Sequence, residues 1–156
     1  MSFIISGLAA DEFQPLFNQS DDALRAQGII RKKADSKPGY PCRITLEDAE
    51  PGETVLLLNH QSLKTDSPFR SSYAIYVREN AQTAQTFTNA LPPVFKGRPI
   101  ALRLFDTDGM LIGADMGKDG SLIEKIEAAF TDPAVAYIHA HNAMHGCFAA
   151  EVKRSE

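Results

Sequence analysis

Apolar and polar side chains alternate along much of the chain, and strict alternation is typical of β-strands that bury one face. Tyr73, Ile75 and Val77 alternate with less apolar neighbours, and the same rule holds over residues 100–104. Residues 54–59 are apolar on both faces, which predicts a central strand covered on each side. We expect six or seven strands, joined mostly by turns of hairpin length.

Helical periodicity is confined to two regions. Residues 11–27 are expected to form two short helical pieces. The better signal follows Ser121, which opens a capping box, because Leu122, Ile126 and Phe130 repeat every four residues behind it. Several strands with only two helical regions predict an α+β fold built on a predominantly antiparallel β-sheet.

The C-terminal stretch 135–153 predicts a β-hairpin that holds three of the four histidines and one of the two cysteines. With residues 142–146 as the loop, His141 lies opposite Cys147, and apolar and polar side chains separate onto opposite faces. Phe148 then belongs to the apolar, core face. Shortening the loop by one residue moves Phe148 to the histidine face and mixes the two sets, so we predict the five-residue loop.

This register predicts a group of metal ligands on one surface, formed by His139, His141 and Cys147, with His145 at the loop tip. A His-x-His pair on a strand places both imidazoles on one side, about 7 Å apart at the backbone, which suits a transition metal. Cys147 adds a thiolate, and His145 or Glu151 a fourth group. A divalent metal such as zinc is therefore the candidate cofactor. The alternative is that these histidines occupy a half-exposed strand and bind nothing.

A second interpretation makes Cys147 a catalytic nucleophile with His139 or His141 as its base, because a reactive thiolate needs a nearby proton acceptor or cation. Against it, the sequence indicates no oxyanion donors and no third orienting group.

Alternation over residues 42–46 predicts another strand, with Cys42 on the core side. A free cysteine there behaves as a small apolar residue.

Four arginines form a further candidate group. Arg43, Arg78 and Arg103 are expected on the polar side of strands, and Arg70 lies in a polar loop. Together they could hold a carboxylate or phosphate by bidentate hydrogen bonds, so a small anionic ligand is the expected partner. The alternative is that each arginine pairs with a neighbouring acid, such as Glu47, Asp66, Glu79 or Asp115.

Length and composition narrow the class of protein. The whole chain, residues 1–156, is expected to be a single domain, and 44% hydrophobic with 23% charged residues is ordinary globular usage. The formal net charge is −4 and no basic block exceeds residues 31–33, so nucleic acid is not an expected partner. Residues 1–10 lack a basic leader and are too short to span a bilayer. We therefore expect no membrane partner, free thiols and a cytoplasmic protein.

Several short segments recur in a recognisable order: FIISGL at 3–8, YPCR at 40–43, LEDAEPG at 46–52, LLLN at 56–59, DSPFR at 66–70, YIHAHN at 137–142, and Gly146-Cys147. In these segments the chain resembles a family of small bacterial proteins, domain-of-unknown-function family 1203. The resemblance runs over nearly the full length and implies a single-domain protein of which this chain is a complete member. It implies no activity, cofactor or catalytic residue.

The leading hypothesis is a cytoplasmic protein that binds a small molecule, with the question of enzymatic activity left open. Its site is expected to combine the hairpin histidines and cysteine with Arg43, Ser67, Arg70, Tyr73 and Arg103. The alternative is an interaction or structural module without catalytic activity, a homo-oligomer in which a second copy or another protein covers the histidine face.

Overall fold

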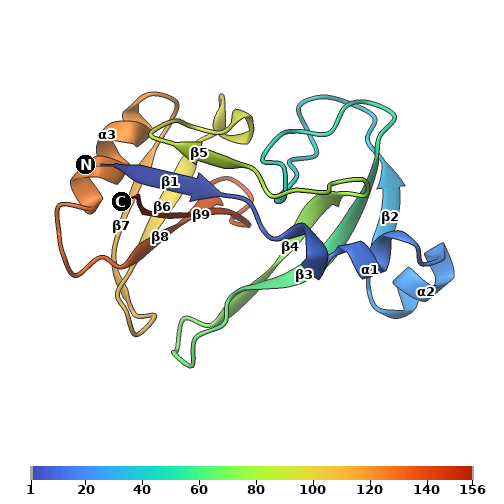
Figure 1. The fold of residues 1–156 in the computed structure, drawn as a ribbon, viewed down its shortest axis with the longest axis horizontal. Helices are drawn as coiled ribbons and strands as arrows, with labels where there is room; N and C mark the ends of the chain where they lie inside the picture. Colours follow the sequence, from blue (N-terminus) through green and yellow to red (C-terminus); the bar gives the residue numbers. More distant parts are fainter. Residues whose placement is uncertain (1, 156) are drawn as a thin grey trace.

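The computed structural model describes residues 2–155, which form two antiparallel β-sheets (Figure 1). The strands of the larger sheet are β1 (Phe3–Ser6), β5 (Thr86–Thr88), β6 (Ile100–Phe105), β7 (Leu111–Gly117), β8 (Tyr137–Asn142) and β9 (Phe148–Arg154). The strands of the smaller sheet are β2 (Ile30–Lys33), β3 (Thr54–Leu63) and β4 (Ser71–Arg78). Their spatial orders are β5-β1-β9-β8-β6-β7 and β2-β3-β4.

The described residues also form five short helical elements. They are the 3-10 turns η1 (Ala10–Glu12) and η2 (Pro93–Phe95) and the α-helices α1 (Gln14–Phe17), α2 (Asp21–Ala26) and α3 (Ser121–Ala129). In Figure 1, α1 and α2 lie beside the smaller sheet and α3 lies at the far end of the larger one. The predicted antiparallel α+β class is confirmed, although the described chain has nine strands in two sheets rather than six or seven in one. No described helix is long and apolar enough to cross a membrane.

Helix α3 packs its apolar stripe against the larger sheet. Leu122, Ile126 and Phe130 are each at most 1% exposed, as their spacing predicts, and they join a core with the inward side chains of β6, β8 and β9. The predicted capping box is wrong, because the N-cap is Gly120 and the Ser121 hydroxyl donates to the Lys118 carbonyl instead. The burial pattern, rather than the cap, identifies this helix.

The smaller sheet has its own core beneath α1 and α2. The central strand β3 contributes Leu56 and Leu58, which pack with Leu24 of α2. Helix α2 begins at a conventional cap, since the Ser20 hydroxyl accepts from the Ala23 amide at 3.1 Å. The apolar run over residues 54–59 therefore marks a central strand, as the sequence predicts.

Apart from an isolated bridge between Cys42 and Tyr76, segment 42–46 consists of turns and a bend and is not the predicted strand. The buried Cys42 sulfur accepts hydrogen bonds from three backbone amides, those of Ile44, Thr45 and Arg78, at 3.3–3.4 Å. The chain thus curls around the sulfur, and Leu46 adopts a φ of +56°. This curl turns Arg43, predicted to lie on the polar side, into the interior, where it is 2% exposed.

The two sheets are joined at both ends of the gap between them. At one end the chain after β1 lies so close to segment 42–46 that a Cβ added to Gly7 would sit 2.1 Å from the Ile44 carbonyl oxygen. At the other end the Ser67 hydroxyl donates to the Gly109 carbonyl at 2.9 Å, which links the β3–β4 connection to the β6–β7 turn. These contacts fix how far apart the sheets stand, and therefore the width of the space between them.

Candidate functional site

The register of the β8–β9 hairpin differs from the predicted one. His141 lies opposite Phe148, and the Asn142 amide donates to the Cys147 carbonyl at 3.0 Å. A β-bulge at this point leaves Ala149 without a partner on β8. The predicted pairing of His141 with Cys147 is therefore wrong.

Five residues, 143–147, connect the strands, one position further along the chain than the predicted loop at 142–146. The Gly146 amide closes it onto the Asn142 carbonyl at 2.7 Å, with a φ of +81° that glycine tolerates. Sequence periodicity misses this arrangement because Ala149 and Ala150 are both small, apolar and buried. Either alanine can occupy the buried position opposite Ala140, so the apolar pattern does not show which of the two is the extra residue of the bulge.

The new register separates the predicted site residues onto two faces. Phe148, predicted on the core face, is buried on the histidine face, with its ring centroid 5.0 Å from that of His139 and 5.9 Å from that of His141. Cys147 lies with Asn142 on the other side, where the Asn142 side-chain nitrogen is 3.7 Å from its sulfur and both residues line a cleft. The thiol and the two imidazoles are thus not brought together.

His139 lies in an aromatic cluster and is 3% exposed. Its ring lies 5.4 Å from that of Phe105 and 5.3 Å from that of Tyr137. Its Nε2 lies 3.3 Å from a carboxylate oxygen of Glu151. Burial acts to raise the pKa of Glu151, but the His139 hydrogen bond and the Lys153 charge outweigh burial and leave this pKa below its ordinary value.

His141 is buried and neutral at physiological pH. Its Nδ1–H donates to the Gly146 carbonyl at 2.9 Å, and its ring packs edge-on against Tyr73 at 4.9 Å. Burial is the main reason that the pKa of His141 falls to about 4, with the positive charges of Arg103 and Arg43 acting in the same direction. Both histidines of the predicted pair are therefore covered within the chain itself.

The predicted zinc ligands consequently fall into two places. His139 and His141 pack against Phe148, while Cys147 and His145 line a cleft on the other side. Within residues 2–155, no group of three or more histidine, cysteine or acidic side chains is arranged to hold a metal ion. The geometry gives the proposed metal set no common centre.

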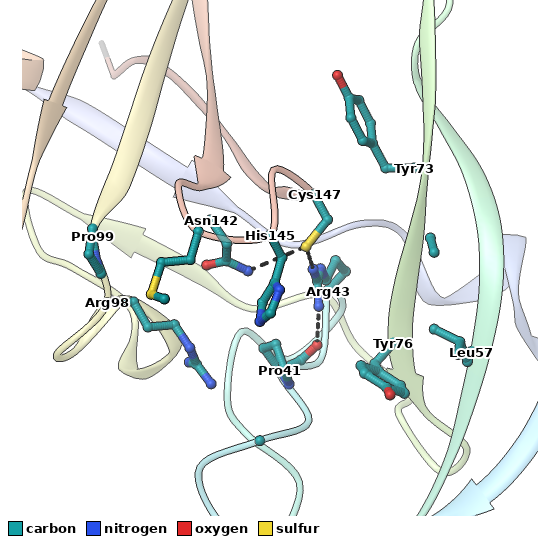
Figure 2. Close-up of a pocket in the computed structure, with 13 residues that line it drawn as sticks. Pro41, Arg43, Leu57, Tyr73, Tyr76, Arg98, Pro99, Asn142, His145 and Cys147 are labelled. Carbon is teal, nitrogen blue, oxygen red and sulfur yellow. Dashed lines mark hydrogen bonds between the residues drawn. The ribbon is translucent and has the colours of Figure 1, made fainter.

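The cleft lies between the two sheets and has a volume of about 580 Å³ (Figure 2). One wall comes from β3 and β4 and presents the side chains of Leu57, Tyr73 and Tyr76. The facing wall comes from the β8–β9 hairpin and presents Asn142, Met144, His145 and Cys147. Pro41, Arg43 and Arg98 also belong to the lining, so the turn at 42–46 supplies a buried charged group.

Arg43 is the unusual member of this lining. Its guanidinium donates to the Phe148 carbonyl at 2.8 Å, to the Pro41 carbonyl at 2.6 Å and to the Cys147 sulfur at 3.1 Å. Burial lowers the pKa of Arg43 from its ordinary value and the neighbouring Cys147 opposes that shift, yet an arginine side chain keeps its proton in proteins. No carboxylate within residues 2–155 pairs with this cation.

Arg98, the second cation of the cleft, is already neutralised. It forms a bidentate pair with Asp48, whose carboxylate is 7% exposed, at 2.7 and 3.0 Å. The same carboxylate accepts from the Gly39 amide at 3.2 Å, which holds the 39–48 segment against the cleft. Arg98 is therefore a structural group, and Arg43 carries the unbalanced charge.

Cys147 is partly exposed to the cleft, and its sulfur has two donors as neighbours. Arg43 Nη2 lies at 3.1 Å and the Asn142 side-chain nitrogen at 3.7 Å (Figure 2). The sulfur is therefore held beside a cation and an amide in the cleft. Asn142 is itself only 9% exposed and also lines the cleft.

The other arginines of the predicted anion site lie elsewhere. Arg70 is exposed and sits 3.5 Å from Asp66, and Arg78 pairs with Glu53 at 2.6 Å. For these two the alternative of pairing with a nearby acid is the observed one. Arg103 lies opposite His139 on the histidine face, 5.8 Å from the Phe105 ring, and does not line the cleft.

The two predicted loop residues have different positions. Ser67 is used within the fold, since its hydroxyl donates to Gly109 and accepts from the Phe69 amide. Tyr73 lines the cleft as expected and separates it from His141. Of the predicted site, Arg43, Tyr73, His145 and Cys147 share the cleft.

Among the lining residues that sequence reasoning misses are three with polar side chains, Asn142, Tyr76 and Arg98. The predicted loop includes Asn142, whereas in the structure Asn142 is the last residue of β8 and its amide donates to the Cys147 carbonyl. No periodic signal marks Tyr76 or Arg98 as site residues, because their position depends on how the two sheets meet. Alternation reports which face of a strand is buried and not what lies opposite it.

Comparison with known proteins gives a family and nothing more specific. No curated protein and no solved structure matches the chain. A family described as a protein of unknown function, DUF1203, matches residues 39–154, a span that includes Arg43, Asn142 and Cys147. The chain therefore belongs to the DUF1203 family of proteins of unknown function.

Proposed function

We propose that this protein binds a small anionic molecule in the cleft, with Arg43 as its anchor. The observation that carries the proposal is a guanidinium, 2% exposed, whose hydrogen-bond partners are two carbonyl oxygens and a sulfur. A buried charge is costly unless it is paired. A carboxylate or phosphate that enters the cleft would supply the missing negative charge.

The remaining lining supports an anion with an apolar part. The lining contains two arginines and no acidic side chain, while Leu57, Tyr73 and Tyr76 form a largely apolar wall. A volume of about 580 Å³ falls within the range of small-molecule sites, which are mostly apolar with a few placed polar groups. An aromatic carboxylate fits this combination better than an inorganic anion does.

Isothermal titration calorimetry with phosphate, sulfate, acetate and benzoate tests the proposal directly. We expect binding of the carboxylates, with benzoate tighter than acetate because its ring would pack on the tyrosine wall. Charge-assisted hydrogen bonds contribute about 1.5–3 kcal/mol each, so Arg43→Met should weaken benzoate binding by about 10-fold or more. Arg25→Met, which removes an exposed arginine from α2, is the matched control and should leave binding unchanged.

Circular dichroism of Arg43→Met establishes whether the variant keeps its fold. A measurement on the unaltered protein guards against misfolding: the NMR signal of the Arg43 Nε–H should move as benzoate is added. The proposal fails if none of the four anions binds at millimolar concentration, or if benzoate binds equally to Arg43→Met.

A further inference from the structure

Cys147 and Cys42 have contrasting surroundings, and only one of the two thiols is open to a ligand. Cys42 is 1% exposed and is enclosed by three backbone amides. Cys147 lines the cleft, where Arg43 and Asn142 both donate to its sulfur. Cys147 is therefore the thiol that a ligand in the cleft can reach, and it lies beside a fixed arginine, the kind of surroundings in which cysteines react as nucleophiles in proteins.

The position of Arg43 connects this sulfur to the proposed anion. A guanidinium carries five N–H donors in a fixed plane. Three bonds to Phe148, Pro41 and Cys147 hold that plane, and they leave two N–H groups for a ligand. An anionic group held there lies beside the sulfur, because one guanidinium contacts both.

We propose that Cys147 is a nucleophile for small carboxylic acids that carry an electrophilic carbon next to the carboxylate. This inference rests on the proposed anion binding at Arg43. The thiol proton first passes to solvent through the open cleft. The sulfur then forms a bond to the electrophilic carbon, the bond from that carbon to its leaving group breaks, and the leaving group departs with the bonding electrons. Arg43 orients the acid by its carboxylate throughout.

Two alkylating agents that differ only in charge provide the test. Iodoacetate and iodoacetamide share the reacting carbon and the iodide leaving group, but only iodoacetate carries a carboxylate. The full chain is treated with each reagent at pH 7, and peptide mass spectrometry measures the rates at Cys147 and Cys42 separately. Glutathione supplies the ratio of the two rates for an unassisted thiol.

We expect the iodoacetate-to-iodoacetamide rate ratio at Cys147 to exceed that of glutathione by about 10-fold or more, because a fixed cation concentrates the anionic reagent at the sulfur. The iodoacetate rate should saturate with concentration, and Cys42 should stay unmodified in the folded protein. Arg43→Met should return the ratio to that of glutathione, whereas Arg25→Met should not change it.

A competition experiment on the unaltered protein keeps the test decisive if Arg43→Met does not fold. Benzoate should slow the reaction of Cys147 with iodoacetate, with half-inhibition near its calorimetric dissociation constant. A rate ratio equal to that of glutathione in a protein that binds benzoate would overturn the nucleophile and leave anion binding standing. Loss of both the ratio and the binding would overturn both proposals.

Discussion

Replacing His141 with glutamine should remove much of the acid sensitivity of the folded protein. His141 is 5% exposed, donates through Nδ1 to the Gly146 carbonyl and packs against Tyr73. Its pKa is about 4 in the folded protein, whereas a histidine in an unfolded chain titrates near 6.5. Between these pH values the unfolded chain binds a proton that the folded protein excludes, so acid favours unfolding.

The size of the effect follows from the two pKa values. A difference of one pKa unit is worth about 1.4 kcal/mol, so the complete effect is about 3 kcal/mol. The stabilisation is present above pH 6.5 and is lost as the pH falls towards 4. About 2 kcal/mol of the free energy of unfolding should therefore disappear between pH 7 and pH 4.5 through this residue alone.

Urea unfolding at pH 7 and pH 4.5, with the protein and His141→Gln compared, measures this contribution. Carboxylates titrate over the same interval in both proteins, so the difference between the two pH dependences isolates His141. Glutamine keeps a donor for the Gly146 carbonyl and has no charge to gain. Equal pH dependences, or an imidazole that titrates near 6.5 by NMR in the folded protein, would refute the account of His141 as a buried neutral side chain.

Two further substitutions test how the cleft is held open. Gly7→Ala places a Cβ 2.1 Å from the Ile44 carbonyl oxygen and should reduce the free energy of unfolding by at least about 2 kcal/mol. Gly120→Ala is the control and should change the free energy of unfolding little, because Gly120 has open space around it and a φ of −57°.

Asp48→Asn leaves Arg98 without its carboxylate and should lower the free energy of unfolding by about 2 to 4 kcal/mol, as measured by urea unfolding at pH 7. Equal stability would mean that this ion pair does not hold the 39–48 segment.

The sequence by itself determined many of the strands and the main helix of the fold, although not the segment at 42–46 or the division into two sheets. The period of two over residues 73–77 and 100–104, and the four-residue repeat that ends at Phe130, mark strands and a helix that the structure contains. Burial imposes these periods locally, so they can be read without knowledge of the partner element. The α+β class and the family follow from the same local information.

Tertiary structure decided the site. The curl around Cys42 turned Arg43 inward, although alternation alone gives the same pattern for a strand with an exposed arginine. The bulge at Ala149 moved Cys147 away from the histidines, and two adjacent buried alanines leave no trace of it in the pattern.

The cleft itself exists only because two sheets meet at a fixed separation. Arg43, Tyr76 and Cys147 come from segments far apart along the chain, and the pattern around each residue reflects only the burial of its own segment. Local patterns record whether a side chain faces the interior, since burial acts on each residue separately. Which charged, aromatic or sulfur group it meets there depends on contacts between distant segments, and only the folded chain supplies those.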